Sequence, residues 1–543
     1  MQNGTSRKRQ SIRRSLPPSK SGPKPAKKAK TSLGVPERRF PKLTSGIIFT
    51  FGQGDVGQLG LGPDVMEKGR PALIPKLDNL IDMCAGGMHT ICLNKKGEVS
   101  SFGCNDEGAL GRDTSEEGSE TEPGPVSLPG TVVQITAGDS HSAALLEDGR
   151  VFAWGSFRDS HGTMGLTLQG GEKKPIQLQT GIAIVKIASG ADHLVMLAED
   201  GQIHTVGCGE QGQLGRVSER GADRMSRQGM GNMLVPGPVP FKPTKKPEFV
   251  DIWTATYGTF AKDKNNQIYV FGLNNYNQIG LKEQKTHFHP SISGPLSEHE
   301  WVQISGGQHH TLALDNNGQV YSLGRREYGR LGLGEDAEDV AVPTLITTFK
   351  DKKVVDISCE GNVSYAVTDN GEVYSWGMGS NMQLGMGDDD SDLWVPTRVK
   401  AKALENKVVK AVSAGGQHTV LLATDASAPA SSSTKEASAK AGSSKQASAK
   451  AKASAASKET NAKGTTKSSA KSNGKVEETT EKKSEADSAE SMETEDSSPK
   501  EEKKPKEEKE PEEKEQEKTE PEEKKSEVVE EESQEEKMDT SDK

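Results

Sequence analysis

The chain has 543 residues, of which 31% are hydrophobic and 4% aromatic, and its formal net charge is −10. This hydrophobic content is too low for a single globule of uniform composition, so we expect the chain to consist of parts that differ in composition. The sequence contains no run of about 18 apolar residues, and its basic start lacks the apolar stretch of a secretory signal. We therefore expect neither a membrane-bound nor a secreted protein. Five cysteines without a C-x-x-C pair indicate buried thiols in a reducing compartment.

Charge and aromatic content divide the chain into three parts. Residues 1–45 carry thirteen Lys and Arg against one acidic residue, residues 46–424 carry a net charge of −13, and residues 425–543 carry −9. All aromatic residues except Phe40 fall in the middle part. Only residues 46–424 can therefore build a hydrophobic core.

The two end parts have the composition of disordered tails. The N-terminal tail contains the basic cluster Arg7, Lys8 and Arg9, which suits a nuclear-import signal and contacts with nucleic-acid phosphates. Residues 425–475 are rich in Lys, Ala and Ser, like a DNA-coating tail, and residues 476–543 are acidic and rich in Glu and Lys. The acidic half also fits a purely solubilising role.

The middle part repeats seven times. An apolar residue followed by glycine ends a strand-like run at spacings of 51, 52, 52, 65, 52 and 53 residues, at Gly52, Gly103, Gly155, Gly207, Gly272, Gly324 and Gly377. Fourteen residues before six of these glycines stands a second landmark, usually histidine: His89, His141, His193, Gly258, His310 and Val363, with His418 as the seventh. Short apolar runs joined by turn pairs such as Asp148-Gly149 separate the landmarks, which is typical of β-hairpins.

Seven units of about 52 residues built from short strands predict an all-β fold, a seven-bladed β-propeller. The first Phe-Gly pair has no histidine landmark before it, and the last landmark has no Phe-Gly pair after it. The run Ile47–Phe51 should therefore pair with the C-terminal strand and close the ring.

Two other interpretations of the repeat are rejected. Gly52-x-Gly54-x-x-Gly57 fits a dinucleotide-binding fingerprint, but the residues that follow cannot open the required helix, so these glycines are assigned to tight turns. The landmark histidines occur once per blade, which predicts a structural hydrogen bond to backbone rather than metal binding. The pair His287-x-His289 lacks nearby Cys or carboxylate ligands, so no metal site is predicted.

Function is expected where one copy of the repeat departs from the others. Just before the landmark, three copies carry Asp139, Asp192 and His309, and equivalent positions share one face of a propeller. These residues would put ionisable groups on one surface, although capping of a local turn by Asp is the alternative.

Two further departures are insertions. The third repeat has two additional residues in the turn Ser156–Gly165, which should bulge outward with Phe157 and Arg158 near the tip or flank; a tolerated surface insertion is the alternative. The fourth unit is about thirteen residues longer than its neighbours and places seven Lys and Arg between Arg216 and Lys246. A basic loop on an acidic body suggests an acidic partner.

The chain resembles a known family over about Gly46 to Ala423. The stretches that carry this resemblance are FGQGDVGQLGLG, AGGMHT, FGCNDEGALGRDTS, AGDSH, WGSFRDS, GCGEQGQLGR, SGGQHH and SLGRREYGRLGLGE. They are similar to the regulator of chromosome condensation family, the guanine-nucleotide exchange factors of the small GTPase Ran. The resemblance does not cover the long C-terminal tail.

The resemblance implies a propeller that binds Ran on one face, and nucleosomal DNA and histones on the opposite side with its N-terminal arm. By motif match the Ran-binding face would contain Asp55, Asp139, Asp192 and His309. The widened turn resembles the wedge that presses on the phosphate-binding region of Ran, with the residues Ser156, Phe157, Arg158, Asp159, Ser160, His161, Gly162 and Thr163. The insertion residues Arg220, Arg224 and Arg227 resemble the loop that engages the acidic patch of the nucleosome.

The activity implied is nucleotide release without covalent chemistry, by a nuclear, chromatin-associated protein that import receptors carry and that needs no cofactor. The competing hypothesis is a chromatin-binding scaffold propeller without exchange activity. The unique turn in the third repeat favours exchange, because a scaffold has no need of a wedge in one blade only.

Overall fold

The structure is a computed structural model that describes residues 34–43, 45–242 and 246–426. The chain divides into two compact units, Met1–Ala437 and Ser438–Lys543, and the described residues all belong to the first. The basic cluster Arg7, Lys8 and Arg9 and the predicted tail segments 427–475 and 476–543 lie outside the described residues.

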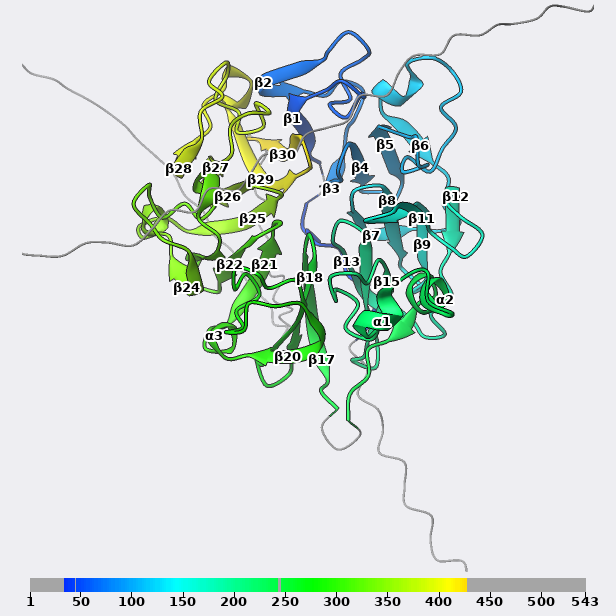
Figure 1. Cartoon of the computed structure of the whole chain (residues 1–543). Helices are drawn as coiled ribbons and strands as arrows, with labels where there is room; N and C mark the ends of the chain where they lie inside the picture. Colours follow the sequence, from blue (N-terminus) through cyan, green and yellow to red (C-terminus); the bar gives the residue numbers. More distant parts are fainter. Residues whose placement is uncertain (1–33, 44, 243–245, 427–543) are drawn as a thin grey trace, which may run out of the picture. The chain divides into compact units, whose positions relative to one another are not determined.

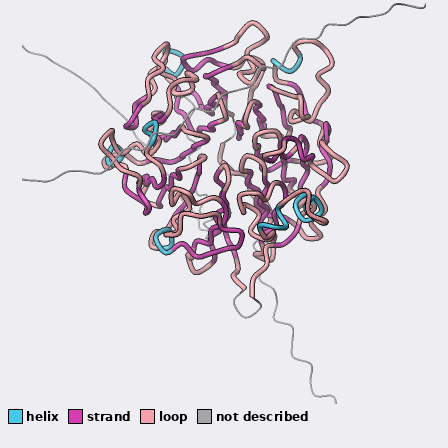
Figure 2. The backbone as a smooth tube through the Cα atoms, in the orientation of Figure 1, coloured by secondary structure: helices cyan, strands magenta, loops and turns pink. Residues whose placement is uncertain are grey.

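Strands dominate the described part of the chain and form seven four-stranded antiparallel units, which we call blades 1 to 7 (Figures 1 and 2). Blade 1 contains β3 (Leu80–Ala85), β4 (His89–Asn94), β5 (Val99–Gly103) and β6 (Gly124–Val126). Blade 2 contains β7 (Val132–Ala137), β8 (His141–Leu146), β9 (Val151–Gly155) and β12 (Glu172–Gln177). Blade 3 contains β13 (Ile184–Ser189), β14 (His193–Ala198), β15 (Ile203–Gly207) and β16 (Gly237–Pro238).

The remaining blades follow the same order. Blade 4 contains β17 (Phe249–Ala255), β18 (Gly258–Asp263), β19 (Ile268–Gly272) and β20 (His287–Ser293), and blade 5 contains β21 (Trp301–Gly306), β22 (His310–Asp315), β23 (Val320–Gly324) and β24 (Val340–Leu345). Blades 4 and 5 are joined by a single parallel bridge between Ala255 and Gly306. Blade 6 contains β25 (Val354–Glu360), β26 (Val363–Thr368), β27 (Val373–Gly377) and β28 (Leu393–Arg398).

Blade 7 closes the ring with strands from both ends of the propeller. It contains β29 (Lys407–Ala414), β30 (His418–Asp425), β1 (Ile47–Gln53) and β2 (Glu67–Leu73). β1 pairs with β30 from Ile47 opposite Ala423 to Gly52 opposite His418, and the two strands lie side by side in Figure 1. The predicted all-β propeller and its closure by the N-terminal strand are confirmed.

A few elements lie outside the blades. The hairpin of β10 (Phe157–Asp159) and β11 (Gly162–Gly165) follows β9, and the insertion after β15 forms two short helices, α1 (Glu219–Ala222) and α2 (Gly229–Leu234). The others are α3 (Gly294–Ser297) and the 3-10 turns η1 (Ser119–Thr121), η3 (Glu327–Gly329), η4 (Thr347–Phe349) and η5 (Lys402–Leu404). Within the described ranges, none of the helices has the length and apolar character needed to cross a membrane.

Strand register explains the constant spacing of the two landmarks. Each landmark residue starts the second strand of its blade, and the glycine that pairs with it lies at or near the end of the third strand. His89 therefore pairs with Gly103 in blade 1, and His418 pairs with Gly52 in blade 7. Gly103 has φ 112°, and a Cβ on it would lie 2.7 Å from the Cα of His89. Only glycine fits this close approach. Gly57 has φ 79° and its N–H donates to the Gly54 carbonyl at 2.9 Å, so the predicted tight turn at these glycines is confirmed.

The landmark histidines join neighbouring blades. The five Nε2 atoms lie 2.7–3.1 Å from a hydroxyl of the next blade, in the pairs His89–Ser142, His141–Ser189, His193–Thr259, His310–Ser364 and His418–Thr90. The predicted structural role is therefore right, but the partner of Nε2 is a side-chain hydroxyl and not backbone. Where blade 6 has Val363 as its landmark, the hydroxyl of Thr419 donates to the Tyr365 hydroxyl at 2.8 Å instead.

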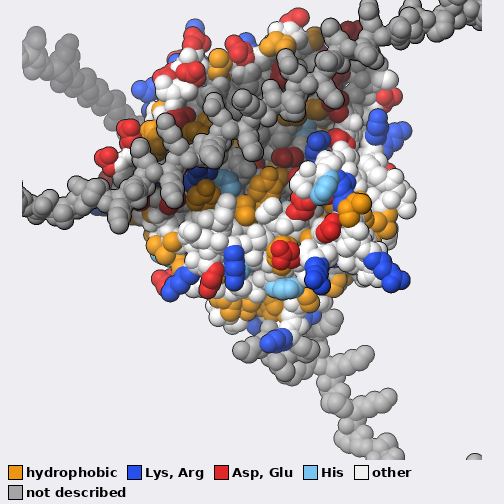
Figure 3. Space-filling model, in the orientation of Figure 1, with side chains coloured by type: hydrophobic (Ala, Val, Ile, Leu, Met, Phe, Trp, Pro, Cys, Tyr) orange, Lys and Arg blue, Asp and Glu red, His pale blue; other side chains and the backbone are white. Residues whose placement is uncertain are grey.

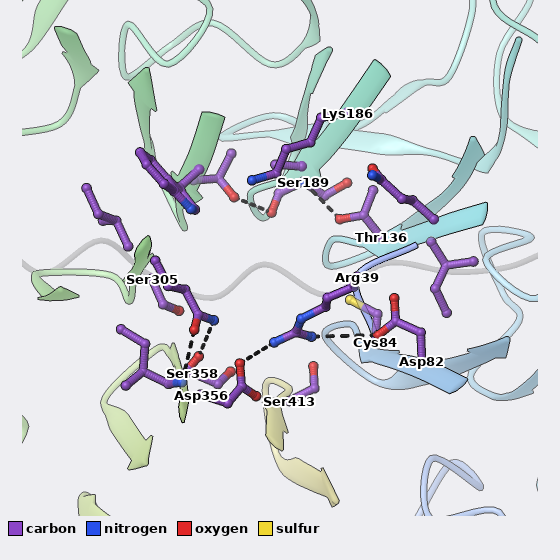
Figure 4. Close-up of a pocket in the computed structure, with 18 of the residues that line it drawn as sticks. Arg39, Asp82, Cys84, Thr136, Lys186, Ser189, Ser305, Asp356, Ser358 and Ser413 are labelled. Carbon is purple, nitrogen blue, oxygen red and sulfur yellow. Dashed lines mark hydrogen bonds and ion pairs between the residues drawn. The ribbon is translucent and has the colours of Figure 1, made fainter. Parts of the chain in front are cut away.

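The first strands of all seven blades surround a central cavity of about 550 Å³. Arg39, which precedes the propeller, reaches into this cavity between Asp356 and Asp82 (Figure 4). Its Nη2 lies 2.5 Å from Asp356 Oδ1 and its Nη1 lies 3.7 Å from Asp82 Oδ1. The prediction of a disordered tail up to residue 45 is therefore wrong for residues 34–43, because this ion pair and the bond from the Gln134 amide to the Glu37 carbonyl hold them against the propeller.

Candidate functional site

Two of the predicted acidic residues lie together at one mouth of the ring. Asp139 follows β7 and Asp192 follows β13, each in the turn before a landmark histidine. Burial and the neighbouring charge of Asp139 together raise the pKa of Asp192 to about 7. Burial also raises the pKa of Asp139, while the positive charge of Arg158 acts to lower it. The two carboxylates form an acidic pair that one cation, Arg158, partly neutralises.

Asp192 does not cap its own turn. Its Oδ1 accepts a hydrogen bond from the main-chain N–H of Arg158 at 2.7 Å, so this carboxylate supports the neighbouring blade's hairpin. For Asp192 the turn-capping alternative is therefore wrong.

Two further residues extend the acidic pair across the mouth. Burial and the nearby charge of Asp139 together raise the pKa of Glu360, at the end of β25, to about 7. The Glu360 carboxylate accepts a hydrogen bond from the Thr256 hydroxyl at 2.7 Å. Burial and the charges of Asp139, Asp192 and Glu360 raise the pKa of the Tyr257 phenol to about 12. Together with Asp139 and Asp192, Glu360 concentrates negative charge at this mouth.

The widened turn is an ordered hairpin whose first residue points inward. Phe157 is fully buried among core residues of blades 2 and 3, and its ring centroid lies 4.6 Å from that of His141. The prediction that Phe157 lies at the tip or flank is therefore wrong, because the hairpin starts with a strand whose first side chain completes the core. Arg158, Ser160, His161 and Thr163 are exposed and Gly162 is half-buried, whereas the side chain of Asp159 is only 2% exposed.

Acidic side chains from neighbouring blade corners hold the hairpin. The Glu107 carboxylate accepts a hydrogen bond from the Thr163 hydroxyl at 2.6 Å and pairs with the Arg158 guanidinium at 3.3 Å. The Glu210 carboxylate accepts from the main-chain N–H of Ser160 at 2.9 Å and from its hydroxyl at 2.7 Å. Figure 3 shows acidic, basic and histidine side chains side by side where β11 and α1 lie in Figure 1. The hairpin is thus a rigid projection next to the acidic pair.

The basic insertion packs against the blade through Arg216. The Arg216 guanidinium donates to the carbonyls of Asn232 at 2.6 Å and Val235 at 2.9 Å, which fixes the end of α2. Arg220 and Arg227 are exposed. Arg224 is not: only 18% of its side chain is exposed, and its guanidinium pairs with Asp159 of the hairpin at 2.8 Å.

The other two predicted face residues lie apart from the acidic pair. The Asp55 carboxylate accepts from the Gln58 amide at 3.0 Å within its own blade corner. His309 packs against the Tyr276 ring with centroids 5.1 Å apart, and the Arg325 guanidinium lies over the same ring at 4.6 Å. Burial and the charges of Arg330 and Arg325 lower the pKa of His309 to about 4, so the imidazole is neutral at pH 7.

One group of side chains has the types and spacing of a cation site. Ligand atoms of Asp159, His161 and Glu210 lie within 4.8 Å of one another. Arg224 already pairs with Asp159, and Glu210 already binds Ser160. The hydrogen bonds and the ion pair account for this group without a metal ion.

Sequence reasoning missed Glu107, Glu210 and Glu360. A signal for Glu210 was present, because it stands three residues after Gly207 as Asp55 stands three residues after Gly52. A signal for Glu360 was also present, because the residue three positions before the landmark is glycine in five copies and alanine in a sixth, and only Glu360 departs from this pattern. The role of Arg224 depends on a contact between two insertions, which the repeat does not predict.

Comparison with known proteins identifies the family. Residues 47–421 match the RCC1-like domain. The chain is 52% identical over 420 residues to the regulator of chromosome condensation of Mus musculus, covering 76% of this chain and 97% of that protein. It is 33% identical over 434 residues to the guanine nucleotide exchange factor SRM1 of Saccharomyces cerevisiae, covering 69% of this chain and 86% of that protein.

A solved structure agrees with these matches. The structure of Prp20p from Saccharomyces cerevisiae, described with its binding properties to Gsp1p and histones, superimposes with a TM-score of 0.65 at 32% identity and covers 70% of this chain and 92% of Prp20p. The chain therefore belongs to the regulator of chromosome condensation family.

Proposed function

We propose that this protein is a guanine-nucleotide exchange factor that releases GDP from the small GTPase Ran at chromatin. The observation that carries the proposal is the hairpin Phe157–Gly165, which only blade 2 carries among the described blades and which is held rigidly beside the acidic pair Asp139 and Asp192. Its relatives named as regulator of chromosome condensation and as guanine nucleotide exchange factor support the same activity.

The acidic mouth is the proposed contact surface for Ran. Asp139, Asp192 and Glu360 concentrate negative charge there, which would attract basic side chains of the GTPase and raise the rate of encounter. Asp55 and His309 are proposed to extend this surface from other blade corners. The exposed hairpin residues Arg158, Ser160 and His161 would then reach the phosphate-binding region of Ran.

Release of nucleotide follows from negative coupling and needs no covalent step. A factor that binds nucleotide-free Ran more tightly than nucleotide-bound Ran lowers the affinity for GDP by the same factor by which GDP lowers the affinity for the exchange factor. A rigid hairpin suits this task, because little conformational entropy is lost when it inserts. The same reciprocity lets GTP release the exchange factor.

Chromatin binding is assigned to basic groups that belong neither to the acidic mouth nor to the hairpin. Arg220 and Arg227 of the insertion are exposed and suit the acidic patch of the nucleosome. Arg7, Lys8 and Arg9 lie outside the described residues and are proposed to contact DNA and nuclear import receptors. The protein would thus act in the nucleus, where it generates Ran-GTP for nucleocytoplasmic transport and assembly of the spindle and nuclear envelope.

The experiment is release of fluorescently labelled GDP from Ran in excess unlabelled nucleotide. The full chain is expected to accelerate release in proportion to its concentration. A protein that binds nucleosomes but leaves the release rate unchanged at micromolar concentration is a scaffold propeller, and this result would reject the exchange activity.

A further inference from the structure

Arg224 connects the basic insertion to the hairpin. Its Nη2 lies 2.8 Å from Asp159 Oδ1, and its Nη1 donates to the main-chain carbonyl of Thr163 at 3.2 Å. The two contacts fall on opposite strands of the hairpin, since Asp159 ends β10 and Thr163 lies in β11. One guanidinium therefore holds both strands of a projection that belongs to another blade.

The partner of Arg224 is a buried charge. The Asp159 side chain is only 2% exposed, and its Oδ1 also accepts the main-chain N–H of His161 at 2.9 Å. A buried carboxylate that loses its cation has to take up a proton or regain water. Either change moves the turn, because Asp159 fixes the turn residue His161.

The neighbouring arginines of the insertion differ from Arg224 in this respect. Arg220 and Arg227 are exposed, and the contacts found among the described residues give neither an ion pair. Of these three arginines of the insertion, Arg224 is therefore directed to the hairpin, and Arg220 and Arg227 are directed to solvent. Arg227 is a matched control, because it has the same charge and lies three residues away.

We propose that Arg224 is a positioning residue of the exchange site, which fixes the hairpin Phe157–Gly165 in the orientation that acts on the GTPase. This inference rests on the proposed exchange function. The residue would not touch nucleotide; it acts through Asp159 and the carbonyl of Thr163. The insertion thus takes part in exchange as well as presenting the exposed arginines.

The activity test compares R224A, R224K and R227A with the unmodified full chain in GDP release from Ran over a range of Ran concentrations. The expected result for R224A is a fall in kcat of about tenfold with KM within about twofold, because the hairpin acts after the acidic mouth has bound Ran. R224K should recover part of the loss, and R227A should match the unmodified chain. A kcat for R224A within twofold of the unmodified value would overturn the proposal.

A double-mutant cycle and a direct probe of the hairpin complete the test. D159N removes the charge that Arg224 compensates, so adding R224A to D159N should cost much less than R224A alone; losses that multiply would overturn the proposal. Hydrogen exchange should rise in residues 157–165 of R224A and not of R227A, and unchanged exchange there would also overturn it. Hydrogen exchange is measured without Ran. It can therefore show whether Arg224 holds the hairpin even if the unmodified chain has no activity in nucleotide exchange.

Discussion

The main-chain N–H of Arg158 donates to Asp192 Oδ1 at 2.7 Å, so the acidic pair and the hairpin form one unit. The bond links the turn before β14 to the start of β10. A carboxylate of the proposed contact surface for Ran therefore also fixes the first strand of the hairpin next to it. The pKa of Asp192, raised to about 7 by burial and by Asp139, makes this bond sensitive to pH near neutrality.

Replacing Asp192 separates these two roles. Asp192→Ala removes the acceptor of the Arg158 N–H, and since hydrogen bonds to charged groups are worth about 1.5 to 3 kcal/mol, kcat/KM for GDP release should fall about tenfold or more. Asp192→Asn keeps a carbonyl oxygen for the same bond and should lose less than the alanine variant. Equal losses in both variants would mean that only the charge matters.

The same residue predicts a pH dependence. The ionised carboxylate is the stronger acceptor, so kcat/KM of the unmodified chain should rise as the pH increases from 6 to 8 through the raised pKa of Asp192. The Asp192→Asn variant has no such proton to lose, and its profile should be flatter. Profiles of the two proteins that coincide, after correction for Ran alone, would contradict this explanation.

Phe157 is expected to control stability and not partner contact. Its side chain is fully buried among core residues, so Phe157→Ala should lower the free energy of unfolding by about 3 to 5 kcal/mol. Arg158→Ala removes an exposed side chain whose ion pair with Glu107 is worth about 0 to 1 kcal/mol, so its stability should stay close to that of the unmodified chain. Chemical denaturation of both variants measures the difference, and similar values would show that Phe157 is not a core residue.

The ring was predictable because its determinants repeat. The 14-residue spacing of His89 and Gly103 is a hairpin register, and the same register recurs from blade to blade, so the number of repeat units and the closure of the ring followed from the placement of the landmarks. The shared face of Asp139 and Asp192 followed from their equivalent positions before the landmark. A repeat thus converts local sequence regularity into three-dimensional placement.

The contacts that the sequence could not predict join segments that belong to no repeat. Phe157 lies in an insertion, where the register of the other blades no longer says which side chain points inward. Arg39 meets Asp356 across 317 residues, and Arg224 meets Asp159 across two insertions. Such pairs depend on the shape of loops and not on a sequence pattern. Because of them, the end of the predicted N-terminal tail at Arg39 and the predicted basic loop at Arg224 are held against the propeller.

Arg39 is predicted to stabilise the ring from inside its cavity. Arg39→Met leaves Asp356 and Asp82 without their cation, and because the arginine is partly exposed, water can replace some of the loss; the free energy of unfolding at pH 7.5 should fall by about 1 to 3 kcal/mol. Arg38→Met is the control, since the Arg38 guanidinium donates only to the exposed carbonyl of Lys95 among the described residues.

The cost of Arg39→Met should depend on pH in a defined direction. Burial raises the pKa of Asp82 to about 6 even beside Arg39, so the folded state binds more protons than the unfolded state between about pH 4 and 6, and stability from this group falls as the pH rises through that range. Removing Arg39 raises this pKa further and extends the loss toward neutral pH. Arg39→Met should therefore be less destabilised at pH 5 than at pH 7.5, and a pH-independent difference in unfolding free energy would contradict the pairing with Asp82.

Charge reversal at Arg220 and Arg227 tests whether the insertion binds chromatin. Both side chains are exposed, so Arg220→Glu with Arg227→Glu should weaken binding to nucleosome core particles by about tenfold or more, with a smaller effect at high salt because screening reduces the contribution of exposed charges. Exchange on free Ran should stay within about twofold, because neither arginine contacts the hairpin. Arg224 is left unchanged in this variant, since reversing it would place a second acid against Asp159 and disturb exchange at the same time. Equal loss of both activities would place nucleosome and Ran on one shared surface, and unchanged nucleosome affinity would assign chromatin binding to other basic groups.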